Sequence, residues 1–151
     1  MVSSNEPNCY GSKSHERFYV FDCAKNVIMD KAVLKLLAEI AILGSNNAQT
    51  KPAQVIIDAL KLTHDGHEIA VTTQALNEFN QGKFDLAANT LMPWCDQQPA
   101  GVAHGLLAMV FWQWGKNSDA ERVCRKVIDE AQEPTAKELA SQILQQMGVT
   151  I

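Results

Sequence analysis

The amino-acid sequence predicts an all-α protein built from helical hairpins that repeat along the chain. Two stretches, 69–99 and 102–134, carry nearly the same pattern when they are laid over each other in one register. In each copy an apolar helical stretch runs into a glycine, and a second helix is expected to begin about two residues later. The register pairs equivalent residues as follows: Ala75 with Ala108, Phe79 with Trp112, Gly82 with Gly115, and Ala87 with Ala120.

This pattern resembles the tetratricopeptide repeat, a helix-turn-helix unit of about 34 residues. Glycines are typical of helix ends, because a left-handed residue there has no Cβ clash. The alanines suit close helix contacts that larger side chains would hold apart. Pro99 and Pro134 are expected to close the two copies, near the end of each second helix. We therefore expect a tetratricopeptide-like domain over residues 29–151, with about three hairpins and a C-terminal capping helix.

Residues 1–28 are expected to form a flexible or irregular N-terminal extension. The stretch MVSSNEPNCYGSKSHE at its start is rich in Ser, Asn and Gly and shows no periodicity. The apolar run FYVF at 18–21 is too short for a signal peptide, and it is a candidate apolar anchor at the N-terminal end of the repeats. A second interpretation is that the natural protein starts at Met29.

The first hairpin begins after Asp30, a candidate N-cap. Gly44 is expected to end its first helix, and the loop SNNAQTK is expected to be a few residues longer than later ones. Pro52 suits the first turn of the second helix. The apolar residues of the first helix recur at helical spacing: Ala32, Val33, Leu36, Leu37, Ile40 and Leu43. Those expected to face inward from the second helix are Ala53, Ile56, Ile57 and Leu60.

The two clear copies predict four more helices, and one amphipathic helix follows them. The four are expected at roughly 67–81, 84–97, 101–115 and 118–132. After Pro134, the last helix carries Leu139, Ile143 and Met147 on one face and ends at Gly148. A lone helix after the last hairpin covers the final apolar face of such a stack, so we expect seven helices in all.

Composition limits the classes of partner. The 151 residues include 13 basic and 17 acidic side chains, a net charge of −4, which argues against nucleic acid or an anionic membrane as the main partner. No apolar run approaches the roughly 18 residues of a membrane-spanning helix. The four cysteines, Cys9, Cys23, Cys95 and Cys124, have no CxxC spacing, and we expect reduced, buried thiols in a cytoplasmic protein.

Few residues suggest chemistry, and we expect neither enzymatic activity nor a cofactor. His64 and His67 lie three positions apart and could hold a metal ion, but no third ligand is close in sequence. A solvated loop is the stronger interpretation, and a small metal-dependent enzyme is the weaker one. His104 is expected to be a packed or groove-lining residue. No nucleophile motif or phosphate-binding loop is present.

The first helix of each tetratricopeptide unit lines the concave surface, so the resemblance implies a binding wall. Most of these positions are apolar here, and Met and aromatic side chains suit a surface that grips a helix. Packing against neighbouring helices is the alternative role, above all for Leu76. The implied positions are Ile69, Thr72, Leu76 and Phe79, then Val102, Gly105, Met109 and Trp112. A wide apolar groove of this kind implies a permanent partner.

Three motifs resemble a narrower family, the tetratricopeptide-like chaperones of bacterial type III secretion needle subunits. They are LLAEIAILGS (36–45), GKFDLAANTL (82–91) and FWQWG (111–115), and the resemblance covers residues 29–147. It implies a heteromeric cytoplasmic complex that keeps the needle subunit from polymerising before export. The repeats would cup the subunit's amphipathic C-terminal helix.

The resemblance also implies a second partner, a small helical co-chaperone on the N-terminal helices. Leu36, Leu37 and Ile40 are the candidate residues for this surface. Residues 1–28 and the loop SNNAQTKP depart from the family pattern. The alternative function is an adapter or chaperone of the same architecture for another secreted protein or peptide tail.

Overall fold

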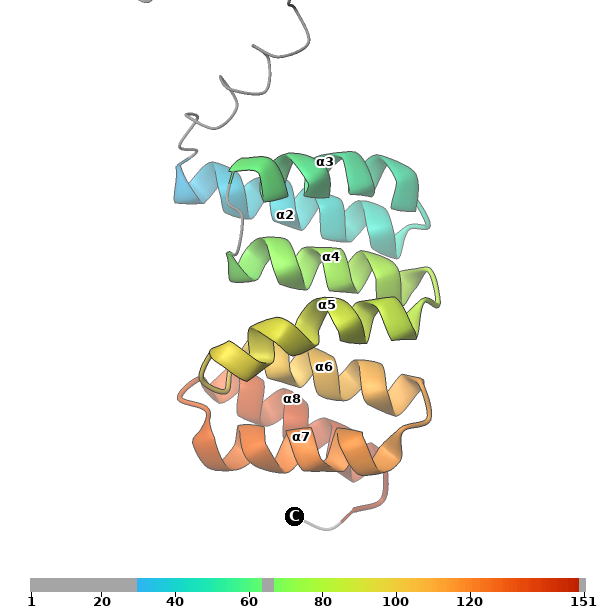
Figure 1. The fold of residues 1–151 in the computed structure, drawn as a ribbon, viewed down its shortest axis with the longest axis vertical. Helices are drawn as coiled ribbons and strands as arrows, with labels where there is room; N and C mark the ends of the chain where they lie inside the picture. The colour runs from blue at the N-terminus through green and yellow to red at the C-terminus, as the bar shows by residue number, and fades with distance from the viewer. Residues whose placement is uncertain (1–29, 64–66, 150–151) are drawn as a thin grey trace, which may run out of the picture.

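The computed structural model describes residues 30–63 and 67–149, and these residues form seven helices without any strand (Figure 1). The predicted all-α class is confirmed in this part of the chain. The expectations for residues 1–28, Met29 and His64 lie outside the described residues. The helices are α2 (Lys31–Asn46), α3 (Thr50–Thr63), α4 (Glu68–Asn80), α5 (Phe84–Gln97), α6 (Val102–Gln113), α7 (Asn117–Glu130) and α8 (Pro134–Gln146).

Consecutive helices pack in pairs, α2 with α3, α4 with α5 and α6 with α7, and the three pairs stack in chain order (Figure 1). The first helix of each pair also contacts the first helix of the next pair, so α2 contacts α4 and α4 contacts α6. Helix α8 packs against both α6 and α7 and covers the C-terminal end of the stack. The predicted boundaries are correct to within two residues for the five helices from α4 to α8.

Each pair is held together at two buried alanines, one on each helix, and their sequence spacing is the same in all three pairs. An alanine at a crossing lets two helix backbones approach more closely than a leucine would. The spacing is therefore the most regular feature of the repeat, and it extends to the first pair. The alanines are Ala41 and Ala53, Ala75 and Ala87, and Ala108 and Ala120, each at most 1% exposed.

The turn between α2 and α3 corrects one prediction. Helix α2 passes through Gly44 and continues to Asn46, and Ala48 takes the left-handed conformation with φ 61°. The Gln49 amide donates to the Gly44 carbonyl (2.8 Å), so Gly44 supplies the acceptor that closes the last turn. Gly82 and Gly115 hold the equivalent left-handed position in the later pairs. Ala48, Gly82 and Gly115 are each followed by a buried alanine at the same distance along the chain. The loop of the first hairpin is therefore not longer than the later ones, contrary to the prediction.

Asp30 is the N-cap residue of α2, as expected, but its side chain makes no capping hydrogen bond. Another helix-end prediction is wrong. Pro134 is the first residue of α8 and does not close α7, because the fixed φ of proline suits the first turn and no intrahelical N–H is lost there. Pro52 does lie in the first turn of α3, as predicted.

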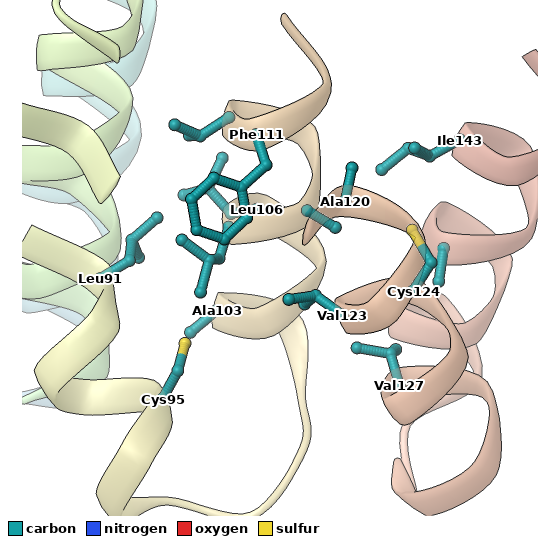
Figure 2. Close-up of a cluster of buried hydrophobic side chains, with 14 of the residues drawn as sticks. Leu91, Cys95, Ala103, Leu106, Phe111, Ala120, Val123, Cys124, Val127 and Ile143 are labelled. Atoms are coloured by element: carbon teal, nitrogen blue, oxygen red, sulfur yellow. The ribbon is translucent and has the colours of Figure 1, made fainter. Parts of the chain in front are cut away.

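The main hydrophobic core extends from α4 to α8, and Figure 2 shows its central part between α5, α6, α7 and α8. Leu91, Val127 and Leu144 are fully buried there. Leu139, Ile143 and Met147 contact this core, as expected. A smaller apolar cluster joins α2, α3 and α4. The inward face of α3 is confirmed, with Ala53, Ile57 and Leu60 buried and Ile56 half-buried.

Helix α2 has two apolar faces, one buried and one exposed. Its core contacts come from Leu34, Ala38 and Ala41, which the periodicity argument did not select. The predicted stripe lies on the other side of the helix, where Leu36 and Ile40 are exposed. Periodicity alone could not show which of two apolar faces would meet the rest of the protein.

Candidate partner-binding site

The predicted binding wall lies on α4 and α6, two helices that pack against each other. Phe79 and Trp112 are equivalent positions one repeat apart, and so are Leu76 and Met109. Within each helix the wall residues recur at helical spacing, so they share one side of that helix. The six apolar candidates are Ile69, Leu76 and Phe79 on α4, and Val102, Met109 and Trp112 on α6.

These side chains are half-buried, and only Val102 is exposed. Leu76, Phe79, Met109 and Trp112 all pack against the main core with part of their surface, and Ile69 packs against the smaller cluster. Each therefore has an anchored part and an accessible part.

Two contacts restrict the wall further. Phe79 packs edge-to-face on Phe84, the first residue of α5, with ring centroids 5.5 Å apart and an interplanar angle of 63°. Gly105 is buried against α8, where an added Cβ would lie 2.9 Å from Cδ2 of Leu139. Gly105 is therefore a packing position for the last helix and is not an open part of the wall.

Hydrogen bonds define the polar margins of the α4 side of this wall. The Thr72 hydroxyl donates to the Glu68 carbonyl (2.7 Å), so its proton is directed into its own helix. At the other end of α4, the Asn80 amide donates to Oδ1 of Asn46 (2.7 Å) and to Oγ of Ser45 (3.0 Å). These bonds tie the C-terminal ends of α2 and α4 together.

A second candidate surface is the outward face of α2, which we call the α2 stripe. It consists of Leu36, Ile40 and Leu43, which are 56%, 46% and 61% exposed, and it is extended by Val33. Leu37, which was predicted with them, is half-buried against the smaller cluster. Apolar side chains at i, i+4 and i+7 form one continuous strip on a helix. The sequence therefore identified this surface only in part, since Leu43 completes it.

A polar network between the first two hairpins was not anticipated. Gln54 of α3 donates to Oε1 of Gln74 on α4 (2.8 Å), and Asn77 donates to Oε1 of Gln54 (2.9 Å). The Glu78 carboxylate accepts from Gln74 (2.6 Å) and from the Thr90 hydroxyl (2.8 Å). The sequence signal that could have revealed it is the repeat register, in which Gln74 and Asn77 take the places that Leu107 and Val110 hold on α6.

A shallow pocket of about 250 Å³ lies beside this network. Its lining residues are Thr50, Lys51, Gln54, Gln74, Glu78, Gln81, Lys83 and Leu86. None of the predicted wall residues lines it, so this pocket and the wall are separate features.

The buried titratable groups support a structural role. His104 is buried, as expected for a packed residue, and its Nε2 lies 3.0 Å from the Cys95 carbonyl oxygen. Burial lowers the pKa of His104, with a further contribution from Lys126. Burial also raises the pKa of the Cys95 thiol to about 12 and that of Cys124 to about 11, which makes both poor nucleophiles near neutral pH.

Both cysteines are free thiols, as predicted, whereas Cys9 and Cys23 lie outside the described residues. Within residues 30–63 and 67–149, no three His, Cys, Asp or Glu side chains gather in a way that could hold a metal ion. At the start of α4, Nδ1 of His67 accepts from the Ile69 amide (3.3 Å) and caps the helix.

Comparison of the chain with protein-family models, with curated proteins and with solved structures found no match. None of the helices in the described part of the chain combines the length and the apolar character needed to cross a membrane.

Proposed function

We propose that this protein is a tetratricopeptide-like cytoplasmic chaperone of a bacterial type III secretion needle subunit. It would bind the amphipathic C-terminal helix of that subunit along the wall on α4 and α6 and keep the subunit monomeric until export. The three motifs described above support the family, and the half-buried apolar side chains on α4 and α6 support the binding surface.

One observation carries the proposal: equivalent positions of two adjacent helices hold large, adaptable, half-buried apolar side chains. Phe79 is succeeded one repeat later by Trp112, and Leu76 by Met109. An amphipathic helix presents its apolar residues at i, i+3, i+4 and i+7, which is a strip of comparable width. A partly anchored aromatic side chain loses little conformational entropy on binding, and such residues are frequent hot spots at interfaces.

The experiment compares Phe79→Ala with Trp112→Ala, alone and combined, against the matched control Trp114→Ala. Trp114 is exposed near the end of α6, where the Nζ of Lys116 lies 3.6 Å from the centroid of its ring, and it is not part of the wall. Binding of the needle subunit's C-terminal helix, made as a labelled peptide, is measured by fluorescence anisotropy.

We expect the double variant to bind at least about a hundredfold more weakly, since each hot spot costs about 2 kcal/mol and 1.4 kcal/mol is tenfold. Trp114→Ala should bind like the parent. Because Phe79 also packs on Phe84, a Phe84→Ala variant controls for the loss of that aromatic pair. A double variant with intact helical circular dichroism and parental affinity would show that the wall is not the binding site.

The alternative is an adapter of the same architecture for another secreted protein or peptide tail. The same wall would serve it, so the variants above do not distinguish the two functions. Co-expression does: the needle-subunit proposal requires a stable heteromeric complex with that subunit, and its absence would favour the adapter.

A further inference from the structure

The junction between the first hairpin and α4 has an apolar half and a polar half. Toward the end of α3, Leu60 packs with Ala70 of α4 in the smaller apolar cluster. Toward the start of α3, Gln54 meets Gln74 and Asn77 of α4 through hydrogen bonds of 2.8 and 2.9 Å. We call these three amide residues the polar seam. Among the described residues, none from α2 or α3 belongs to the main core, which extends from α4 to α8.

The next junction, between α5 and α6, is apolar at the same positions of the repeat. Figure 2 shows part of this contact, where Leu91 of α5 is directed toward α6. One repeat after the polar seam, the equivalent residues are buried members of the main core. They are Ala88, Leu107 and Val110, each at most 4% exposed. At the first junction, a hydrogen-bonded contact therefore takes the place of an apolar one.

The polar seam holds its two helices together less firmly than an apolar contact would. Its hydrogen bonds can be exchanged for bonds to water at a small net cost, whereas separating apolar surfaces loses their burial outright. Asn77 is fully buried and donates to Oε1 of Gln54 and to the Thr50 carbonyl (3.3 Å), but no described group donates to its Oδ1. Separation of the helices would give that oxygen access to water. A shallow pocket of about 250 Å³ beside the seam, lined in part by Thr50, Gln54 and Gln74, further reduces the packing there.

The face of α4 that α3 covers is polar enough to end a stack. Repeat proteins need terminal elements whose outer face is polar, and α4 would present Gln74 and Asn77 on that face. On α2 the equivalent residues are Ile40 and Leu43, which are exposed. At the position of Leu36, which is also exposed, α4, α6 and α8 hold buried alanines. The helices from α4 to α8 thus already carry a polar end face, and the first hairpin is an addition to it.

We propose that α2 and α3 form a separately opening unit, which parts from α4 along the polar seam while α4 to α8 stay folded. Opening below the free energy of global unfolding is typical of regions with few buried apolar contacts. It changes the position of the α2 stripe relative to the binding wall on α4 and α6, since the two surfaces lie on opposite sides of the seam. The first hairpin is thus a conformational device that varies the spacing of the two candidate surfaces. This opening depends on the packing of the described helices and not on the proposed chaperone function.

Hydrogen exchange of the full-length protein, followed by mass spectrometry, tests the proposal. Peptides from α2 and α3 are compared with peptides from α6 and α7 at several urea concentrations below the unfolding transition. We expect the amides of α2 and α3 to exchange at least about tenfold faster. Their exchange should quicken with urea, but less steeply than that of α6 and α7, because the opening exposes only part of the surface that global unfolding exposes.

A variant that carries the residues of the next junction tests the role of the seam. Gln54→Ala, Gln74→Leu and Asn77→Val are combined, since alanine, leucine and valine stand at these positions of α5 and α6. Exchange in α2 and α3 should slow by at least about tenfold, because separation would then expose apolar surface. The matched control is Asn89→Val, which replaces an exposed amide side chain of α5 and should leave exchange in α2 and α3 unchanged.

A change inside the main core separates the two parts of the chain. Val127 of α7 is fully buried and stays packed when only the first hairpin opens. Val127→Ala should therefore quicken exchange in α6 and α7 by about tenfold or more, while exchange in α2 and α3 stays at the parental rate. Equal acceleration in all four helices would mean that they unfold as one unit, and this result would overturn the proposal.

Gln54→Ala alone guards against misfolding of the triple variant. It leaves Gln74 and Asn77 without that partner, so exchange in α2 and α3 should quicken by about tenfold. Exchange there that ignores every change to the seam, or that does not respond to urea, would show that these helices fray without parting from α4. Either result contradicts the proposal, as does exchange in the parent that is as slow in α2 and α3 as in α6 and α7.

Discussion

Ala48 and Gly82 hold the same left-handed turn position in two successive hairpins, with φ 61° and 72°. Both amides bond back into the helix that ends there, Ala48 to the Ser45 carbonyl (3.1 Å) and Gly82 to the Phe79 carbonyl (2.8 Å). A non-glycine residue is strained in this conformation because its Cβ approaches the backbone. The first hairpin therefore carries a local strain that the second does not.

Replacing Ala48 by glycine should stabilise the protein. Relief of the left-handed strain is worth roughly 1–2 kcal/mol, and the greater freedom of glycine in the unfolded chain offsets about 0.5–1 kcal/mol of it. We expect the free energy of unfolding in urea to rise by about 0.5–1 kcal/mol.

The reverse change, Gly82→Ala, should lower the free energy of unfolding by about 1 kcal/mol. No heavy atom lies within 4 Å of the Cβ that would be added, so any loss comes from φ and not from crowding. Parental stability for Gly82→Ala would show that the turn conformation carries no such cost.

Overpacking the helix crossings should destabilise the repeats. Ala87 and Ala120 are fully buried, so replacing either by leucine should lower the free energy of unfolding by about 1–3 kcal/mol. Ala59→Leu on the exposed side of α3 is the control and should change the stability little. If Ala87→Leu and Ala120→Leu have the same melting temperature as Ala59→Leu, these alanines do not lie at tight helix crossings.

Gly105 and Leu139 should be energetically coupled. An alanine at 105 gains helix propensity of about 1 kcal/mol, but its Cβ would meet Leu139 at 2.9 Å. We therefore compare the change in the free energy of unfolding that Gly105→Ala causes in two backgrounds. In a Leu139→Ala background we expect this change to be more favourable by about 0.5 kcal/mol or more than in the parent. A double-mutant cycle in urea measures this difference, and strict additivity would mean that the contact with α8 relaxes without cost.

His104 should make the protein less stable in mild acid. Its pKa is lowered in the folded state by burial and then by Lys126, while the Cys95 carbonyl, Glu130 and Glu68 act in the opposite direction. The folded protein thus resists protonation that the unfolded chain accepts. This contribution is fully present above the unfolded pKa of about 6.5 and is lost as pH falls from there through the folded pKa.

Thermal melts of the parent and of His104→Gln between pH 7.5 and pH 5 check this expectation. The glutamine keeps a donor for the Cys95 carbonyl and removes the titration, so the parent should lose more of its melting temperature than the variant. All other histidines are common to both proteins and cancel in the comparison. Parallel curves would remove His104 as the source of acid sensitivity.

Much of the fold was predictable because it depends on local patterns. The repeat step between Ala75 and Ala108 located the hairpins, and Gly82 and Gly115 located the turns. The turn of the first hairpin was harder to predict. Its left-handed residue is Ala48, whereas the sequence analysis expected the first helix to end at the nearby Gly44. The spacing between Ala41 and Ala53, which equals that of the later alanine pairs, would have shown the correct register.

The candidate surfaces were less predictable than the helices. The positions of Phe79, Met109 and Trp112 on their helices followed from the repeat, but their half-buried state and the contact of Phe79 with Phe84 did not. Likewise, Gly105 was placed on a binding wall by its register, and only the docking of α8 showed that Leu139 covers it. The exposure of a side chain depends on which other helix packs against it. Sequence periodicity describes a single helix and does not identify that second helix.

By itself, the sequence determined the all-α class, the pairing of helices and most turn positions, because periodicity, glycine and alanine act within one hairpin. The tertiary structure alone decided which apolar face of each helix is buried. Leu36 and its equivalent alanines on later helices have the same place in the repeat, yet only Leu36 is exposed. The difference arises because burial of apolar area requires a second element in contact, and α2 is the one first helix of a pair without a preceding helix among the described residues.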